Sequence, residues 1–148
     1  MPVSTEYIGR TFPPGAPYEV SRVKIAEFAD AIGDPNPVYR DRGAAQGAGH
    51  PDVIAPPTFA IVISMASSGQ AMGDPGFGLN YSMVVHGEER FEYTRPIVAG
   101  DILVATSTIS NIRSAGSNTL ITTSTDISTP AGEHVCTAHS ILVERGSG

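Results

Sequence analysis

The stretch "APPTFAIVISMASSGQAM", residues 55–72, decides the fold. Pro56 and Pro57 suit the entry and first turn of a helix, where a missing backbone N–H does little harm. The body from Phe59 to Ala66 is apolar almost all round, which is typical of a helix buried on every face. The sequence therefore predicts a central helix that the rest of the chain must wrap.

The second half of the chain is rich in Val, Ile, Thr, Tyr and Phe and is divided by turn signals. The expected strands are 82–96, 101–114, 118–130 and 133–145. This pattern predicts consecutive antiparallel strands in a meander. Polar and apolar residues alternate most clearly in 102–110 and 120–128, so one sheet face is expected to be wet or to pair with another chain.

Helices and a short N-terminal strand are expected before the central helix. One helix begins after Ser21 as N-cap and ends near Gly33. Its apolar residues recur at helical spacing on one face, namely Ile25, Phe28, Ala29 and Ile32. A second, short helix is expected over 41–46.

These elements predict one α+β domain over residues 1–148, in which an antiparallel sheet wraps around a central buried helix. Only the sheet is large enough to cover a helix that is apolar all round. This arrangement is the hot-dog fold. Such a sheet leaves an edge or a face that usually pairs in a dimer.

Composition excludes several classes of function. The 148 residues carry a net charge of −6, which argues against non-specific nucleic-acid binding. The single cysteine, Cys136, excludes an internal disulfide and is expected to be packed away. No apolar run approaches the roughly 20 residues of a membrane span, and the first residues lack a signal-peptide pattern. We expect a cytoplasmic protein that binds neither nucleic acid nor membrane.

Two motifs resemble a known family. "FADAIGDPNPVY", residues 28–39, is similar to the hydratase motif of MaoC-like (R)-hydratases and dehydratases, which runs Gly-Asp-x-Asn-Pro-aliphatic-His. "FEYTRPIVAGD", residues 91–101, resembles the strand and turn "RP-x-x-AGD" of the same family. The phrases "VIAPPTF", residues 53–59, and "HGEERFEYTRP", residues 86–96, resemble the HadA/HadC-type small subunit of actinobacterial (3R)-hydroxyacyl-ACP dehydratases.

The resemblance implies a reaction and also two departures from its chemistry. In catalytic members, an Asp and a His handle water and a proton at an acyl thioester, and a backbone N–H at the start of the central helix polarises the carbonyl. Here Asp34 and Asn36 match the motif, but Tyr39 stands where the His should be. Tyrosine, with a pKa of about 10, is a poor base at neutral pH. Pro57 stands where the family has Gly, and proline has no N–H to donate.

Several residues keep alternative interpretations. Thr58 or Phe59 could supply a shifted amide in place of the missing one. Asp34 before a proline is also good turn chemistry, with its carboxylate capping a backbone N–H. His50 is the histidine to test as a replacement base.

Other polar groups have structural interpretations beside functional ones. Arg95 could meet a phosphopantetheine phosphate or form an ordinary ion pair. The hydroxyls of Ser64, Ser67 and Ser68 on the central helix are expected to bond back to the preceding turn.

We therefore expect a subunit of a (3R)-3-hydroxyacyl-thioester dehydratase or enoyl hydratase. The chain would bind the acyl group of an acyl-CoA or acyl-ACP thioester, and a catalytic hot-dog subunit would supply the Asp–His pair. Asp34 is the remnant catalytic residue, and no metal or other cofactor is expected. The residues expected to contact substrate are Asn36, Tyr39, Pro57, Thr58, Phe59, Ile63 and Met65. Alternatives are an autonomous homodimeric hydratase or thioesterase, and a non-catalytic acyl-thioester binding protein.

Overall fold

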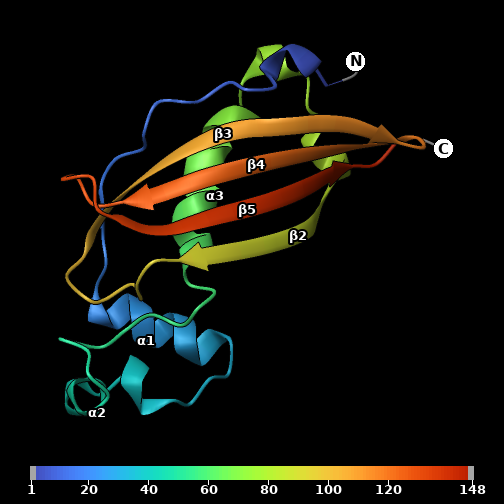
Figure 1. Cartoon of the computed structure of the whole chain (residues 1–148). Helices are drawn as coiled ribbons and strands as arrows, with labels where there is room; N and C mark the ends of the chain where they lie inside the picture. The colour runs from blue at the N-terminus through green and yellow to red at the C-terminus, as the bar shows by residue number, and fades with distance from the viewer. Residues whose placement is uncertain (1–2, 147–148) are drawn as a thin grey trace.

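A computed structural model describes residues 3–146. A curled five-stranded antiparallel sheet lies across one long helix, and two further helices gather at one end of it (Figure 1). The strands are β1 (Tyr18–Glu19), β2 (Val84–Tyr93), β3 (Ile102–Ala115), β4 (Asn118–Ser128) and β5 (His134–Glu144). The helices are α1 (Arg22–Ala31), α2 (Arg42–Gly47) and α3 (Ala60–Met72), with short 3-10 helices η1 (Thr5–Tyr7), η2 (Pro37–Tyr39), η3 (Pro75–Phe77) and η4 (Tyr81–Met83). The predicted hot-dog fold is confirmed.

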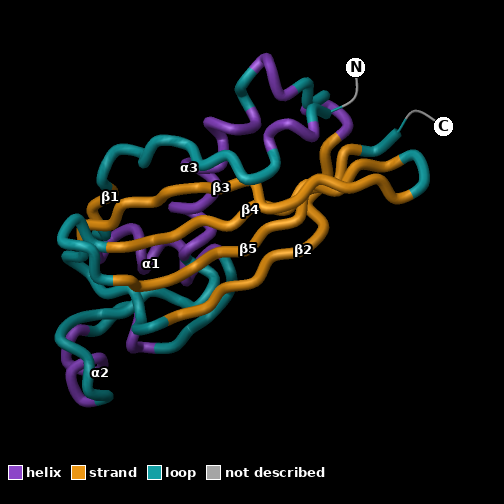
Figure 2. The backbone as a smooth tube through the Cα atoms, turned by 45° about the horizontal axis from the view of Figure 1, so that its top comes forward, coloured by secondary structure: helices purple, strands orange, loops and turns teal. Residues whose placement is uncertain are grey.

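The order of the strands corrects the predicted meander. It is β1-β3-β4-β5-β2, so β3, β4 and β5 are consecutive neighbours but β2 pairs with β5 (Figure 2). The segment between β2 and β3 does not make a hairpin, because it is held by the chain that precedes α3. The N–H of Ala55 donates to the carbonyl of Ile97 over 2.8 Å, and Ile54 forms a bridge with Val98. This anchoring leaves β2 on an edge of the sheet.

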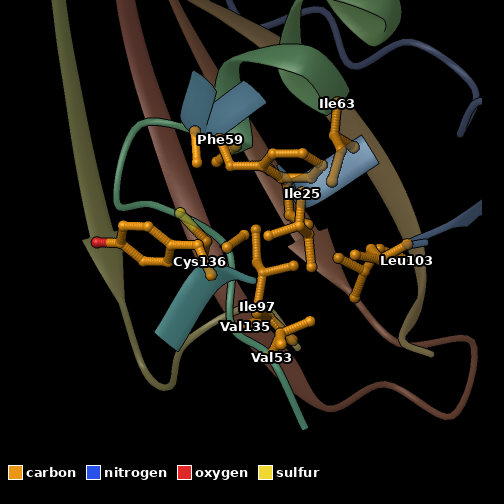
Figure 3. Close-up of a cluster of buried hydrophobic side chains, with 14 of the residues drawn as sticks. Ile25, Val53, Phe59, Ile63, Ile97, Leu103, Val135 and Cys136 are labelled. Atoms are coloured by element: carbon orange, nitrogen blue, oxygen red, sulfur yellow. The ribbon is translucent and has the colours of Figure 1, made fainter. Parts of the chain in front are cut away.

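The inner face of the sheet packs on α3. Buried residues alternate along the central strands, with Leu103, Ala105, Ser107 and Ile109 on β3 and Ile121, Thr123, Thr125 and Ile127 on β4. Phe59 and Ile63 pack in one cluster with Ile25 of α1 and with Leu103 of this face (Figure 3). The ring of Phe59 meets that of Phe28 edge to face, with 5.4 Å between centroids. The core therefore joins α1, the start of α3 and the sheet.

The prediction that α3 is buried on every face is wrong for part of its surface. Met65 is 59% exposed, and Ala66 is exposed as well. The sheet of this chain lies against one side of the helix (Figure 1), and it leaves Met65 and Ala66 exposed. An apolar helix with one uncovered side is an incomplete core in a single chain.

A chain of hydroxyl groups ties α3 to the sheet. Ser67 Oγ donates to the carbonyl of Ala105 over 3.2 Å, and Ser107 Oγ donates to Ser67 Oγ over 3.0 Å. Ser107 also bonds to Thr125 Oγ1 over 2.8 Å. Ser67 therefore does not bond back to its own helix as predicted. Its buried position beside β3 offers a cross-layer carbonyl instead, and a buried hydroxyl must find a partner.

The first two helices follow their predicted signals with one exception. Ser21 Oγ accepts from the N–H of Lys24 at the start of α1, and Asp41 caps α2. Ile25 and Ala29 are fully buried. Ile32, which the helical spacing predicts on the same face, is 49% exposed, because α1 ends at Ala31 and the chain turns away at Gly33 with φ 72°.

Candidate functional site

In the Asp34–Tyr39 segment, here called the motif loop, the side-chain oxygens of Asp34 and Asn36 accept hydrogen bonds from the loop's own backbone. Asp34 Oδ1 accepts from the N–H of Asn36 over 3.0 Å, and Asn36 Oδ1 accepts from the N–H of Val38 over 3.1 Å. Arg40 closes the loop by donating to the carbonyls of Asp34 and Asn36. These are the contacts of a turn and of a helix cap, so Asp34 and Asn36 hold the loop in shape.

Tyr39 is buried at the end of the motif loop and is only 7% exposed. Burial raises the pKa of its phenol above the ordinary value, and the nearby negative charge of Asp34 raises it further. Both causes favour the neutral form, because both penalise a phenolate. Tyr39 is therefore a neutral hydroxyl at physiological pH and cannot act there as a general base.

The entry to α3 has a proline where the resemblance implies an oxyanion donor. Pro57 occupies that position, and its carbonyl accepts from Tyr93 Oη over 2.6 Å. Burial raises the pKa of Tyr93 as well, so its hydroxyl remains a donor. The N–H of Phe59, one of two amides considered as substitutes, donates to the carbonyl of Pro56 over 2.9 Å. Of the two, only Thr58 remains as a possible donor.

A cavity of about 310 Å³, here called the loop cavity, opens beside these groups. Its walls come from the motif loop, the entry to α3 and the end of β2, and they are Tyr39, Ile54, Ala55, Pro57, Tyr93, Thr94, Arg95 and Pro96. Tyr39 and Pro57, the two residues that depart from the hydratase pattern, both line it. The structure thus brings them to one place.

A second cavity of about 220 Å³, here called the helix–sheet cavity, lies between α3 and the inner face of the sheet. Its lining from α3 is Ile61, Ser64, Met65, Ser68, Gly69 and Met72, and from the rest of the chain Tyr81, Val84, His86, Glu89, Thr123, Thr125, Ala138, Ser140 and Leu142. Polar and apolar side chains are equally numerous in this lining, but most of the surface that they expose to the cavity is apolar, which suits a hydrocarbon chain. The two cavities share no lining residue.

His86 and Glu89 form a polar pair on the wall of the helix–sheet cavity. His86 Nε2 lies 2.8 Å from Glu89 Oε2, and Glu89 Oε1 is buried with no hydrogen-bond partner among the described residues. This pair was not predicted from the sequence. The signal was present, because Gly87 inside a strand marks a bulge, and a bulge changes which residues share a face.

The remaining predicted site residues lie elsewhere. Phe59 and Ile63 belong to the hydrophobic core, and Thr58 is exposed beside it. None of the three lines either cavity, so their contact with a substrate stays a prediction. Met65 does line the helix–sheet cavity. His50 lines neither cavity.

The contacts of three further groups are those of structural residues. These groups are Arg95, the serine hydroxyls of α3 and the thiol of Cys136. Arg95 pairs with Asp101 at 2.8 Å and with Glu133 at 3.2 Å, which is the ion-pair alternative. Ser64 and Ser68 donate to the carbonyls one turn back, as predicted. Cys136 is fully buried, and burial raises its pKa to about 11.

Two absences concern the described residues alone. Within residues 3–146, no three His, Cys, Asp or Glu side chains gather as ligands for a metal ion. None of the helices in that range is both long and apolar enough to cross a membrane.

The sequence and the fold both resemble known proteins. Residues 6–138 match the family described as FAS1-like, dehydratase domain region. A UPF0336 protein of Thermobifida fusca is 52% identical over 146 residues, which cover 99% of this chain and 96% of the relative. Among solved structures, a MaoC-like dehydratase superposes with a TM-score of 0.87 at 33% identity, over 95% of this chain and 43% of that chain.

A second solved structure extends the likeness in fold. The C-terminally truncated HadBC complex of Mycobacterium tuberculosis, a 3R-hydroxyacyl-ACP dehydratase, has a TM-score of 0.84 at 23% identity, over 93% of this chain and 96% of that chain. With its curled sheet, long helix and motif loop, this chain belongs to the family described as FAS1-like, dehydratase domain region, and has the MaoC-like hot-dog fold.

Proposed function

We infer that this chain is the acyl-binding, non-catalytic subunit of a dehydratase or enoyl hydratase that acts on (3R)-3-hydroxyacyl thioesters. The observation that carries the proposal is the joint loss at the loop cavity. Tyr39 is a neutral phenol where the family places its histidine, and Pro57 has no N–H where the family places its oxyanion donor. A chain that has the fold of the family but lacks the histidine and the donor amide is suited to binding a substrate without catalysing its reaction.

The exposed surface around the helix–sheet cavity supports a partner. Met65, Tyr81 and Val85 are large apolar side chains that are 59%, 69% and 42% exposed. Met65 and Tyr81 line that cavity, and Val85 lies on β2, the edge strand. Exposed apolar side chains at a cavity and on an edge strand are typical of a protein interface. The HadBC neighbour is itself a complex, which makes a second hot-dog chain the natural partner.

The proposed division of labour follows from these surfaces. The partner would hold the thioester with its own Asp–His pair and its own helix amide. The helix–sheet cavity of this chain would hold the far part of the acyl chain, on Ile61, Met65 and Met72. Carriage of the acyl group by CoA or by ACP, and location in the cytoplasm, are both compatible with the proposal.

The test compares hydration of crotonyl-CoA and of a longer enoyl-CoA by the chain alone and by the chain mixed with a hot-dog partner that has the motif His. We expect no turnover alone and turnover in the mixture. The Asp34→Ala variant is expected to support the same turnover in the mixture as the native chain.

Two results would contradict the proposal. Turnover by the chain alone that is abolished in Asp34→Ala would establish the autonomous enzyme instead. Binding of the thioesters without turnover in either arm would favour the non-catalytic binding protein.

A further inference from the structure

A bulge in β2 turns two titratable side chains into the helix–sheet cavity. The register of β2 against β5 shifts between His86 and Glu88, so Gly87 stands outside the regular pairing. In an unbroken strand, residues three positions apart point to opposite faces. Here Gly87 is an extra residue in the strand, so the alternation shifts by one position and His86 and Glu89 point to the same face. Both line the cavity. A β-carbon at Gly87 would lie 3.1 Å from the carbonyl oxygen of Ile141, so glycine suits the close approach to β5.

The pair leaves one carboxylate oxygen without a donor. The Glu89 side chain is 14% exposed and that of His86 is 44% exposed. Glu89 Oε2 is hydrogen-bonded to His86 Nε2, whereas Oε1 is buried and unpartnered among the described residues. A buried acceptor in that state is unusual in a native protein and calls for a partner.

The neighbouring hydroxyls do not supply that partner. Ser64 and Ser68 give their protons to carbonyls of α3, and Thr125 is bonded to Ser107. Ser140 Oγ lies 3.4 Å from His86 Nε2, the same nitrogen that faces Glu89. Because both contacts meet at one nitrogen, Ser140, His86 and Glu89 do not form a nucleophilic triad, which needs the two ring nitrogens on opposite partners.

We propose that Glu89, oriented by His86, is a specificity residue that accepts a hydrogen bond from a hydroxyl group on the distal part of the bound acyl chain. This inference rests on the function proposed above. Most of the surface exposed in this cavity is apolar, with Ile61, Met72 and Leu142 among its walls. A neutral hydroxyl on a hydrocarbon chain fits such walls, whereas an ammonium group would lose its solvation there. Since the thioester lies with the partner subunit, the hydroxyl is remote from carbon three of the acyl group.

The test measures dissociation constants of the purified full chain for decanoyl-CoA and for a set of hydroxydecanoyl-CoA isomers whose hydroxyl moves outward one carbon at a time. At the matching position we expect the native chain to bind the hydroxylated thioester about tenfold more tightly than decanoyl-CoA, as for a hydrogen bond to a charged acceptor. Glu89→Leu should lose this preference while binding decanoyl-CoA at least as well. Glu89→Gln, which keeps the shape of the side chain, should show a reduced preference even if the Leu variant folds poorly.

Glu88→Gln is the matched control, because Glu88 is the exposed neighbour of Glu89 and does not line the cavity. It should keep the native preference. Equal affinities across the isomers in the native chain, or a preference that survives in Glu89→Leu, would overturn the inference and leave the proposed function standing. Failure to bind decanoyl-CoA itself would instead refute acyl binding, and this inference with it.

Discussion

The motif loop and the helix–sheet cavity differ in what their polar groups do. In the motif loop, Asp34 Oδ1 and Asn36 Oδ1 each accept a hydrogen bond from the backbone N–H two residues later in the chain. In the helix–sheet cavity, Glu89 keeps a buried oxygen with no partner in the described chain. The loop resembles a hydratase motif in sequence, yet Asp34 Oδ1 and Asn36 Oδ1 both bond to its own backbone. The contrast shows that a recognisable motif can have a structural role, while residues of β2 outside any motif line the helix–sheet cavity.

The first prediction tests whether Phe59 belongs to the core or to a binding wall. Phe59 is fully buried against Phe28 and Tyr18, so Phe59→Ala should destabilise the protein by about 3–5 kcal/mol. Urea denaturation measures the loss. Thr58→Ala, one residue earlier and exposed, should change stability by less than about 0.5 kcal/mol. A small loss for Phe59→Ala would place Phe59 outside the core.

The second prediction concerns the hydroxyl chain beneath the helix–sheet cavity. Ser107→Ala removes a buried donor between Ser67 and Thr125 and leaves their hydroxyls with fewer partners. We expect a loss of about 1–3 kcal/mol in the free energy of unfolding. Ser124→Ala on the same sheet is the matched control, because Ser124 alternates with buried Thr123 and Thr125 and so faces away from α3. Equal effects of the two substitutions would show that the hydroxyl chain contributes nothing.

The third prediction separates structure from chemistry in the motif loop. Asp34→Ala removes the acceptor of the Asn36 N–H, which should cost about 1 kcal/mol of stability. Asn36→Ala, which removes the acceptor of the Val38 N–H, should cost a similar amount. Thermal unfolding measures both. Under the proposed function, neither substitution changes turnover in the reconstituted complex, and a large fall in turnover with Asp34→Ala alone would return Asp34 to catalysis.

The smallest expected effect is a dependence of the free energy of unfolding on pH, caused by the contact between Asp52 and Arg22, the first residue of α1. A hydrogen bond from Arg22 lowers the pKa of Asp52 to about 2, and the N–H of Val53 contributes in the same direction. The unfolded carboxyl titrates near 3.9, so the unfolded state takes up the proton first as pH falls. The stabilisation is therefore present above about pH 4 and is lost between about pH 4 and pH 2.

The measurement is the difference in unfolding free energy between the native protein and Asp52→Asn across that range of pH. The difference should shrink as the pH falls toward 2. Asp30→Asn is a suitable control, because the side chain of Asp30 is 71% exposed although it pairs with Arg40. A difference that stays constant with pH would mean that the Asp52 carboxyl does not titrate below its ordinary value.

Much of the fold was predictable because its signals are local. Ser21 and Gly33 bracket α1, the alternation of residues marks β3 and β4, and the apolar run 59–66 marks α3. The position of β2 in the sheet was not predictable, since a strand pattern does not specify which other strand the segment pairs with. The candidate site divides in the same way. Tyr39 and Pro57 could be read as departures from a motif, but their meeting in one cavity depends on how the loop packs against the entry to α3.

The sequence by itself determined the elements, the motif loop, and the presence of Tyr39 and Pro57 where the hydratase pattern has other residues, because these depend on residue type and on neighbours along the chain. Only the tertiary structure decided that β2 lies on an edge, that Met65 is uncovered and that Ser67 bonds to β3. It also decided that His86 and Glu89 face one cavity. The physical reason is that pairing, burial and the phase of a bulge are set by contacts between segments distant in sequence, which no local pattern contains.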